Sequence, residues 1–163
     1  VDKLIVAGNA VQARLALHHL KKNKIDRKDL PRFASLCRRV ALFDLAVLAL
    51  RPYVYPSSRN AIVSSAAEKA EYASVLTELG ASCEALNLLK DIDPKEYPQV
   101  LLYRSFAFFT RWEYVHAVPL LEKYVALPHL TMIPVFTICI SRVLAVAALS
   151  SRVSCWKLAG HTT

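Results

Sequence analysis

The stretch that decides the fold is residues 66–94, AAEKAEYASVLTELGASCEALNLLKDIDP. It holds two apolar-periodic runs of helical length, separated by Gly80 and closed by Pro94. Glycine readily adopts the left-handed conformation that ends many helices, and proline cannot continue a helix. The pattern therefore predicts one helix over about 60–79, a turn at Gly80, and a second helix over about 82–92.

The same alternation of apolar runs and helix-ending residues extends outward along the chain. The eight prolines bracket most of the runs. The apolar spacing predicts further helices over about 3–22, 29–39, 42–51, 97–110, 113–126 and 131–149. Glycine occurs three times in 163 residues, which is too rare for a fold built on tight β-hairpins. We therefore expect an all-α protein, with Pro119 inside a helix that is kinked or begins near His116.

Several classes of function are disfavoured by composition and spacing. The dinucleotide fingerprint and the P-loop both need clustered glycines, and Gly8, Gly80 and Gly160 are far apart. The four cysteines lack zinc-ligand spacing and are expected to pack as small hydrophobes in a reducing compartment. The sequence accordingly predicts no enzyme, no catalytic or metal-binding residue and no cofactor, and a cytoplasmic location, or a nuclear one in a eukaryote.

The acidic residues of the 60–79 helix need a separate interpretation. Glu68, Glu71 and Glu78 recur along this helix, but none is paired with a histidine three residues later, as a carboxylate metal site would require. A solvated helix face explains them better.

The formal net charge of +8 is concentrated in one region. Residues 14–39 hold nine basic and two acidic residues, whereas residues 60–130 hold nine acidic and six basic ones. Such a basic end attracts acidic partners, nucleic acid or anionic lipid, and charge alone does not choose among them.

A small residue followed four positions later by leucine recurs in the second helix of each predicted pair. The instances are Ala46/Leu50, Ala85/Leu89 and Ala117/Leu121, with alanines 39 and 32 residues apart. The best unit resembles a tetratricopeptide repeat, whose period is 34 residues. The resemblance rests on Ala73, Gly80, Ala85 and Pro94; a second unit follows to Pro128, with Trp112 in its turn.

The resemblance covers about residues 28–128 and implies one domain, a right-handed α-solenoid of antiparallel hairpins. The hairpins would span about 28–58, 60–94 and 97–128, with flanking helices over 3–22 and 131–149. Three departures from the family pattern leave a generic array of α–α hairpins as the alternative. The first-helix tryptophan is absent, the 28–58 unit is irregular, and Pro94 comes early.

The resemblance also implies a concave groove that binds a protein or peptide. The groove positions would include Lys28, Arg32, Ser35 and Arg39 near its basic end, and Tyr103 and Phe106 farther along. The first four are spaced to share one helix face, which is either a solvated basic face or a docking site for an acidic peptide, a C-terminal carboxylate or a phosphate. Tyr103 and Phe106 either pack in the core or anchor a bound helix.

The function that these features favour is a non-enzymatic scaffold or adaptor for a protein or acidic peptide. One alternative is a helical protein that binds nucleic acid through residues 14–39. Another is a helical subunit of an obligate complex, homo- or hetero-oligomeric. Residues 132–149 are long enough for a short membrane span, but Arg142 near their middle favours a buried closing helix.

Overall fold

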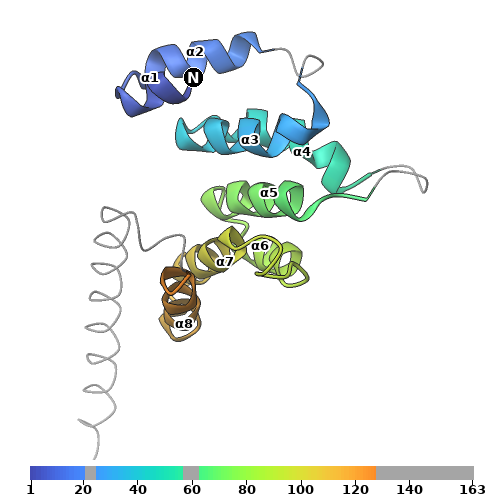
Figure 1. Ribbon diagram of the computed structural model, residues 1–163, viewed down its shortest axis with the longest axis vertical. Coiled ribbons are helices and arrows are strands. Elements are labelled where there is room, and N and C mark those ends of the chain that lie inside the picture. Colours follow the sequence, from blue (N-terminus) through green and yellow to red (C-terminus); the bar gives the residue numbers. More distant parts are fainter. Residues whose placement is uncertain (21–24, 57–62, 128–163) are drawn as a thin grey trace, which may run out of the picture.

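The computed structural model describes residues 1–20, 25–56 and 63–127, and within these ranges it is helical with no strand (Figure 1). The elements are α1 (Asp2–Val6), α2 (Ala10–His19), the 3-10 turn η2 (Arg27–Asp29), α3 (Leu30–Arg39), α4 (Phe43–Val54), α5 (Ala66–Glu78), α6 (Ser82–Leu89), α7 (Gln99–Phe109) and α8 (Tyr114–Val125). The all-α prediction is confirmed for these ranges. The predicted helix over 131–149 lies outside them.

The ends of α5 follow from local sequence. At its start, Ser65 and Glu68 form a capping box in which each side chain accepts a hydrogen bond from the other's backbone N–H. At its end, Gly80 takes a φ of +85°, and Ala81 N–H donates to the Leu76 carbonyl. The predicted turn at Gly80 is thereby confirmed. The helix begins at Ala66 rather than near residue 60.

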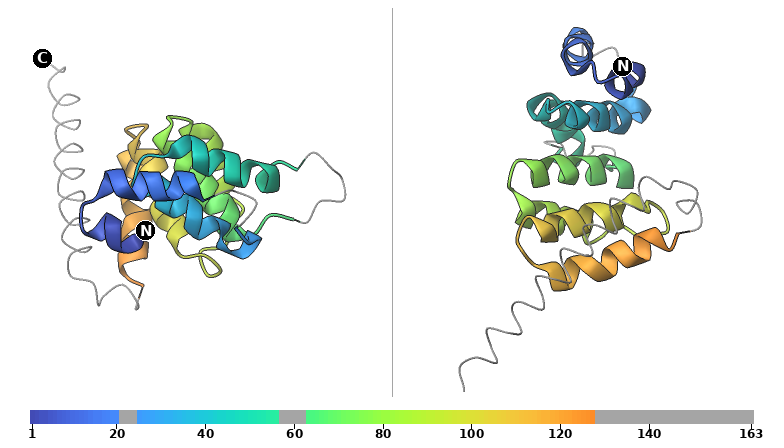
Figure 2. Two further views of the ribbon diagram at one scale, coloured as in Figure 1. Left: turned by 90° about the horizontal axis from the view of Figure 1, so that it is seen from above. Right: turned by 90° about the vertical axis from the view of Figure 1, so that its left-hand side faces the viewer.

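Successive helices pack in pairs, and each pair contacts the next. α3 packs on α4, α5 on α6 and α7 on α8, while α3 and α4 contact α5, and α5 and α6 contact α7. Figures 1 and 2 show the described helices layered in chain order from α1 and α2 to α8. α3, α5 and α7, the first helices of their pairs, therefore follow one another across the fold.

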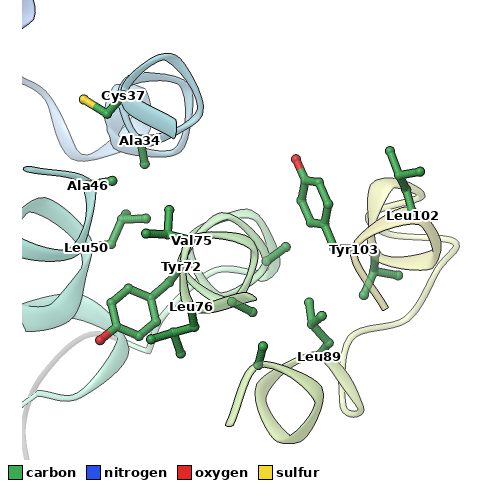
Figure 3. Close-up of a cluster of buried hydrophobic side chains, with 14 of the residues drawn as sticks. Ala34, Cys37, Ala46, Leu50, Tyr72, Val75, Leu76, Leu89, Leu102 and Tyr103 are labelled. Carbon is green, nitrogen blue, oxygen red and sulfur yellow. The ribbon is translucent and has the colours of Figure 1, made fainter. Parts of the chain in front are cut away.

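The core is built from small residues beside leucines. Ala46, Ala85 and Ala117 are fully buried, as are Leu50 and Leu89, which follow two of them by one helical turn. Figure 3 shows the alanine and leucine of α4 beside the α5 side chains of Tyr72, Val75 and Leu76. Alanine lets two helices approach closely, and the neighbouring leucine fills the adjacent space.

Several details differ from the sequence-based expectations. The helix predicted over 3–22 is divided at Gly8, whose φ of +75° interrupts the helix between α1 and α2. α4 continues through Pro52, where the sequence predicted a helix end. α8 contains Pro119, as expected, and begins at Tyr114 rather than near His116. Each proline leaves the carbonyl four residues earlier without its usual donor. Those residues, Leu48 and Val115, are exposed, so water can replace the missing donor.

The two cysteines in the described residues differ in burial. Cys37 is buried, as predicted, and burial raises the pKa of its thiol to about 12. Cys83 is exposed, so the prediction of core packing is wrong for it. It lies at the start of α6, where its Sγ accepts a hydrogen bond from Arg111. Cys139 and Cys155 lie outside the described residues.

Candidate functional site

A cleft of about 450 Å³ lies where η2, α3, α5 and the start of α7 meet. A volume of this size is typical of ligand pockets. Its polar lining comes from segments distant in sequence: Lys28, Arg32, Ser35, Glu71, Gln99 and Tyr103. We use "the cleft" for this space and "the rim" for Lys28 and Arg32, both exposed.

The cleft brings together four of the six residues that the sequence singled out. Lys28, Arg32, Ser35 and Tyr103 line it, whereas Arg39 and Phe106 do not. Arg39 lies farther along α3 and pairs with Asp2 of α1, with 3.1 Å between Nη1 and Oδ1. Phe106 is exposed on α7. Tyr103 is 6% exposed and extends from the α7 ribbon in Figure 3, so it is both a core residue and part of the cleft wall.

The deepest polar group in the cleft is the carboxylate of Glu71, on the face of α5 that meets α3 and α7. Its Oε1 accepts hydrogen bonds from the hydroxyls of Tyr103 at 2.5 Å and Tyr97 at 3.2 Å. Burial raises the pKa of Glu71, while the Tyr103 hydrogen bond, the charge of Arg38 and the Tyr97 hydrogen bond oppose that rise. Burial likewise raises the pKa of both tyrosines above the usual range, so both remain donors at neutral pH.

The second oxygen of Glu71 is not satisfied. Glu71 Oε2 and Arg38 Nε lie 3.8 Å apart, and both are buried without a hydrogen-bond partner. The Arg38 guanidinium is held instead by Tyr103, with 3.4 Å from Nη2 to the hydroxyl and 5.3 Å to the ring centroid. Burying a charged donor and a charged acceptor without completing their hydrogen bonds is costly, so this pair is the unusual feature of the cleft.

The rim cations have exposed carboxylate neighbours. Lys28 Nζ lies 3.3 Å from Asp26, and Arg32 Nη2 lies 3.0 Å from Asp2 Oδ2. Asp2 therefore joins Arg32 and Arg39 through its two oxygens, and the hydrogen bond from Arg32 lowers the pKa of Asp2. These contacts show that the α3 arginines can bind one carboxylate between them. Because all these groups are exposed, an external anion can compete for the cations.

The interpretation of the α5 glutamates as a solvated face is wrong for two of the three. Glu68 is 2% exposed and Glu71 is 4% exposed, while Glu78 is exposed as predicted. Each buried glutamate faces an arginine from the basic 14–39 region, Arg27 for Glu68 and Arg38 for Glu71. Sequence reasoning missed both pairs. The spacing of Ser65 and Glu68 is a readable signal for the capping box at the start of α5, but no local signal marks the pairing of either glutamate with an arginine.

Searches for other kinds of site gave no positive result in the described part of the chain. Within it, no cluster of three or more histidine, cysteine, aspartate or glutamate side chains could hold a metal ion. Of the helices in residues 1–20, 25–56 and 63–127, none is long and apolar enough to cross a membrane; residues 132–149 lie outside these ranges. Comparisons of the chain with protein-family models, curated proteins and solved structures found no match.

Proposed function

We propose that this protein is a non-enzymatic scaffold that binds an acidic peptide in the cleft. In this proposal the helix pairs form a right-handed α-solenoid of tetratricopeptide-like hairpins, and the cleft belongs to its binding groove. The observation that carries the proposal is the convergence in one cleft of Lys28, Arg32 and Ser35 with Tyr103. The sequence predicts all four as groove positions.

Charge favours an acidic ligand. Lys28 and Arg32 at the rim are paired with the exposed carboxylates of Asp26 and Asp2, which an acidic ligand can replace, and Arg38 beside the cleft is paired with Glu71. The exposed rim can attract an anion from solution, and Ser35 and Gln99 add neutral polar groups for a peptide backbone. An extended acidic segment fits this combination better than a cationic or purely apolar one.

Fluorescence anisotropy with a labelled decapeptide of alternating glutamate and glycine tests the proposal. The double variant Lys28→Glu with Arg32→Glu should bind at least about tenfold more weakly, because two attractive charges become repulsive. Lys90→Glu with Lys123→Glu is the matched control. It makes the same change in net charge at two exposed positions outside the cleft lining, one directly after α6 and one on α8. It should bind almost as wild type does.

Three results would contradict the proposal. Equal losses in the two double variants would mean that binding follows net charge alone. No binding of the acidic decapeptide by the wild-type protein would remove the peptide function. Tighter binding of a single-stranded RNA oligonucleotide, with an affinity that falls steeply as salt rises, would favour the nucleic-acid alternative.

A further inference from the structure

The unpaired atoms of Arg38 and Glu71 have complementary chemistry. Arg38 Nε is a hydrogen-bond donor and Glu71 Oε2 is an acceptor. Their separation of 3.8 Å exceeds the 2.7–3.2 Å typical of an N–H···O hydrogen bond. Neither atom has another partner, although Glu71 Oε1 accepts two hydrogen bonds and Arg38 Nη2 donates one.

A ligand group that is both a hydrogen-bond acceptor and a donor could bond to Arg38 Nε and Glu71 Oε2 at the same time. A hydroxyl oxygen can accept from Arg38 Nε and donate its proton to Glu71 Oε2, each over an ordinary distance. A carboxamide can do the same with its oxygen and its NH₂ group. The Arg38 side chain is 20% exposed although its Nε is buried, so the proposed binding requires this side chain to shift and admit a small polar group.

We propose that Arg38 and Glu71 make the cleft selective for acidic peptides that carry a hydroxyl or carboxamide side chain next to the acidic residue. The inference rests on the proposed function. The acidic residue binds at the rim, and the neighbouring serine, threonine, asparagine or glutamine inserts between Arg38 Nε and Glu71 Oε2. Arg38 and Glu71 are then specificity-determining residues, while the rim supplies the charge attraction.

The surroundings disfavour the two simpler ligands for these atoms. A lysine side chain could pair with Glu71 Oε2, but it would enter a site already holding Arg38 and the rim cations, and like charges repel. An apolar side chain would leave both buried atoms without hydrogen bonds, the situation that binding sites penalise most strongly. A neutral group that is donor and acceptor together avoids both costs.

The test uses acetylated and amidated pentapeptides, Glu-Glu-Xaa-Glu-Glu, with serine, asparagine, alanine or valine at the central position. Isothermal titration with the full chain should show the serine and asparagine peptides binding about tenfold more tightly than the alanine and valine peptides, the ratio expected for hydrogen bonds to charged groups. Glu71→Met and Arg38→Met should bring this ratio close to one. Glu71→Gln, whose single amide oxygen accepts from the tyrosines and whose NH₂ group then takes the place of Oε2, should also lower the ratio towards one.

Lys123→Met is the matched control, because it replaces an exposed charged residue with methionine on α8, outside the cleft lining. Its ratio should stay at the wild-type value. If Glu71→Met does not fold, as judged by circular dichroism, Arg38→Met and Glu71→Gln decide the question. Equal binding of all four peptides to the wild-type protein overturns the inference and leaves the proposed function standing. Binding of none of them overturns the proposed function, and the inference with it.

Discussion

α5 carries two buried glutamates one turn apart, and each faces an arginine from the segment that enters or forms α3. Both carboxylate oxygens of Glu68 accept hydrogen bonds from Arg27, at 2.7 Å for Oε1 and 2.9 Å for Oε2. The Ser65 backbone N–H also donates to Oε2. Glu71 receives tyrosine hydroxyls on one oxygen, and its other oxygen stands 3.8 Å from Arg38 without a hydrogen bond. The two sites thus share residue types and low solvent exposure, but they differ in hydrogen-bond geometry and in how deeply the carboxylate lies in the protein.

The balance between hydrogen-bond geometry and burial decides how each of these ion pairs behaves. Hydrogen bonds from Arg27 hold the pKa of Glu68 below its ordinary value of 4.5, against the effect of burial. At Glu71 burial is the larger influence and raises the pKa above that value. In the Arg27–Glu68 pair both carboxylate oxygens accept hydrogen bonds from the arginine. In the Arg38–Glu71 pair one donor and one acceptor beside the cleft make no hydrogen bond.

The largest difference in the free energy of unfolding is expected when each glutamate is replaced with glutamine. Glu68→Gln should lower the free energy of unfolding by about 2–3 kcal/mol, because it removes a bidentate charged contact and leaves Arg27 without its counterion. Glu71→Gln should change it by less than about 1 kcal/mol, because the amide oxygen still accepts from the tyrosines and the cost of burying a charge disappears. Urea denaturation measures both. Equal losses would show that the two sites do not differ as described.

A smaller difference should separate the two arginines. Arg27→Lys should cost about 1–2 kcal/mol, because lysine cannot reproduce the two-pronged contact with Glu68 or the stacking over Tyr53, whose ring centroid lies 4.9 Å from the guanidinium. Arg38→Lys should cost less, about 0.5–1 kcal/mol, because it gives up the hydrogen bond and the stacking with Tyr103 but no hydrogen bond to Glu71. The same urea titrations test this pair, and a larger loss for Arg38→Lys would contradict it.

The smallest effect is a difference in how stability depends on pH. Glu68 has a lowered pKa in the folded protein, so its contribution is present above about 4.5 and is lost as pH falls through the folded pKa. Glu71 has a raised pKa, so the folded state holds the proton more tightly, and stability falls as pH rises from 4.5 through the folded pKa. The free energy of unfolding should be measured from pH 3 to pH 8. Glu68→Gln should remove the loss of stability below about pH 4.5, and Glu71→Gln should remove the loss of stability above pH 4.5. A change of the same sign in both variants would refute the assignment.

The helices and some of the residues that line the cleft could be predicted from the sequence. Apolar periodicity and Gly80 located the α5–α6 turn. The spacing of Lys28, Arg32, Ser35 and Arg39 predicted one shared face, of which the first three residues line the cleft, Lys28 from η2, and Arg39 does not. These features are local, because a helix face and a helix end are set by residues a few positions apart.

The buried glutamates could not be predicted in the same way. Arg27 and Glu68 are 41 residues apart, and Tyr103 and Glu71 are 32 apart. Whether a charged residue faces water or an arginine on another helix depends on how the helices stack, which no short spacing encodes. The residue counts reveal a basic region and an acidic region, but they do not reveal which side chains pair where α3 and the segment before it contact α5.

The capping box of α5 has a consequence for folding. Glu68 Oε2 accepts hydrogen bonds from the Ser65 backbone N–H and from Arg27 at the same time. Starting a helix is the costly step in forming it, and here the first turn of α5 is completed by a side chain from the segment leading into α3. Nucleation of α5 and docking of that segment therefore reinforce each other, so the two should form and unfold as one cooperative unit, with amide protons that exchange together.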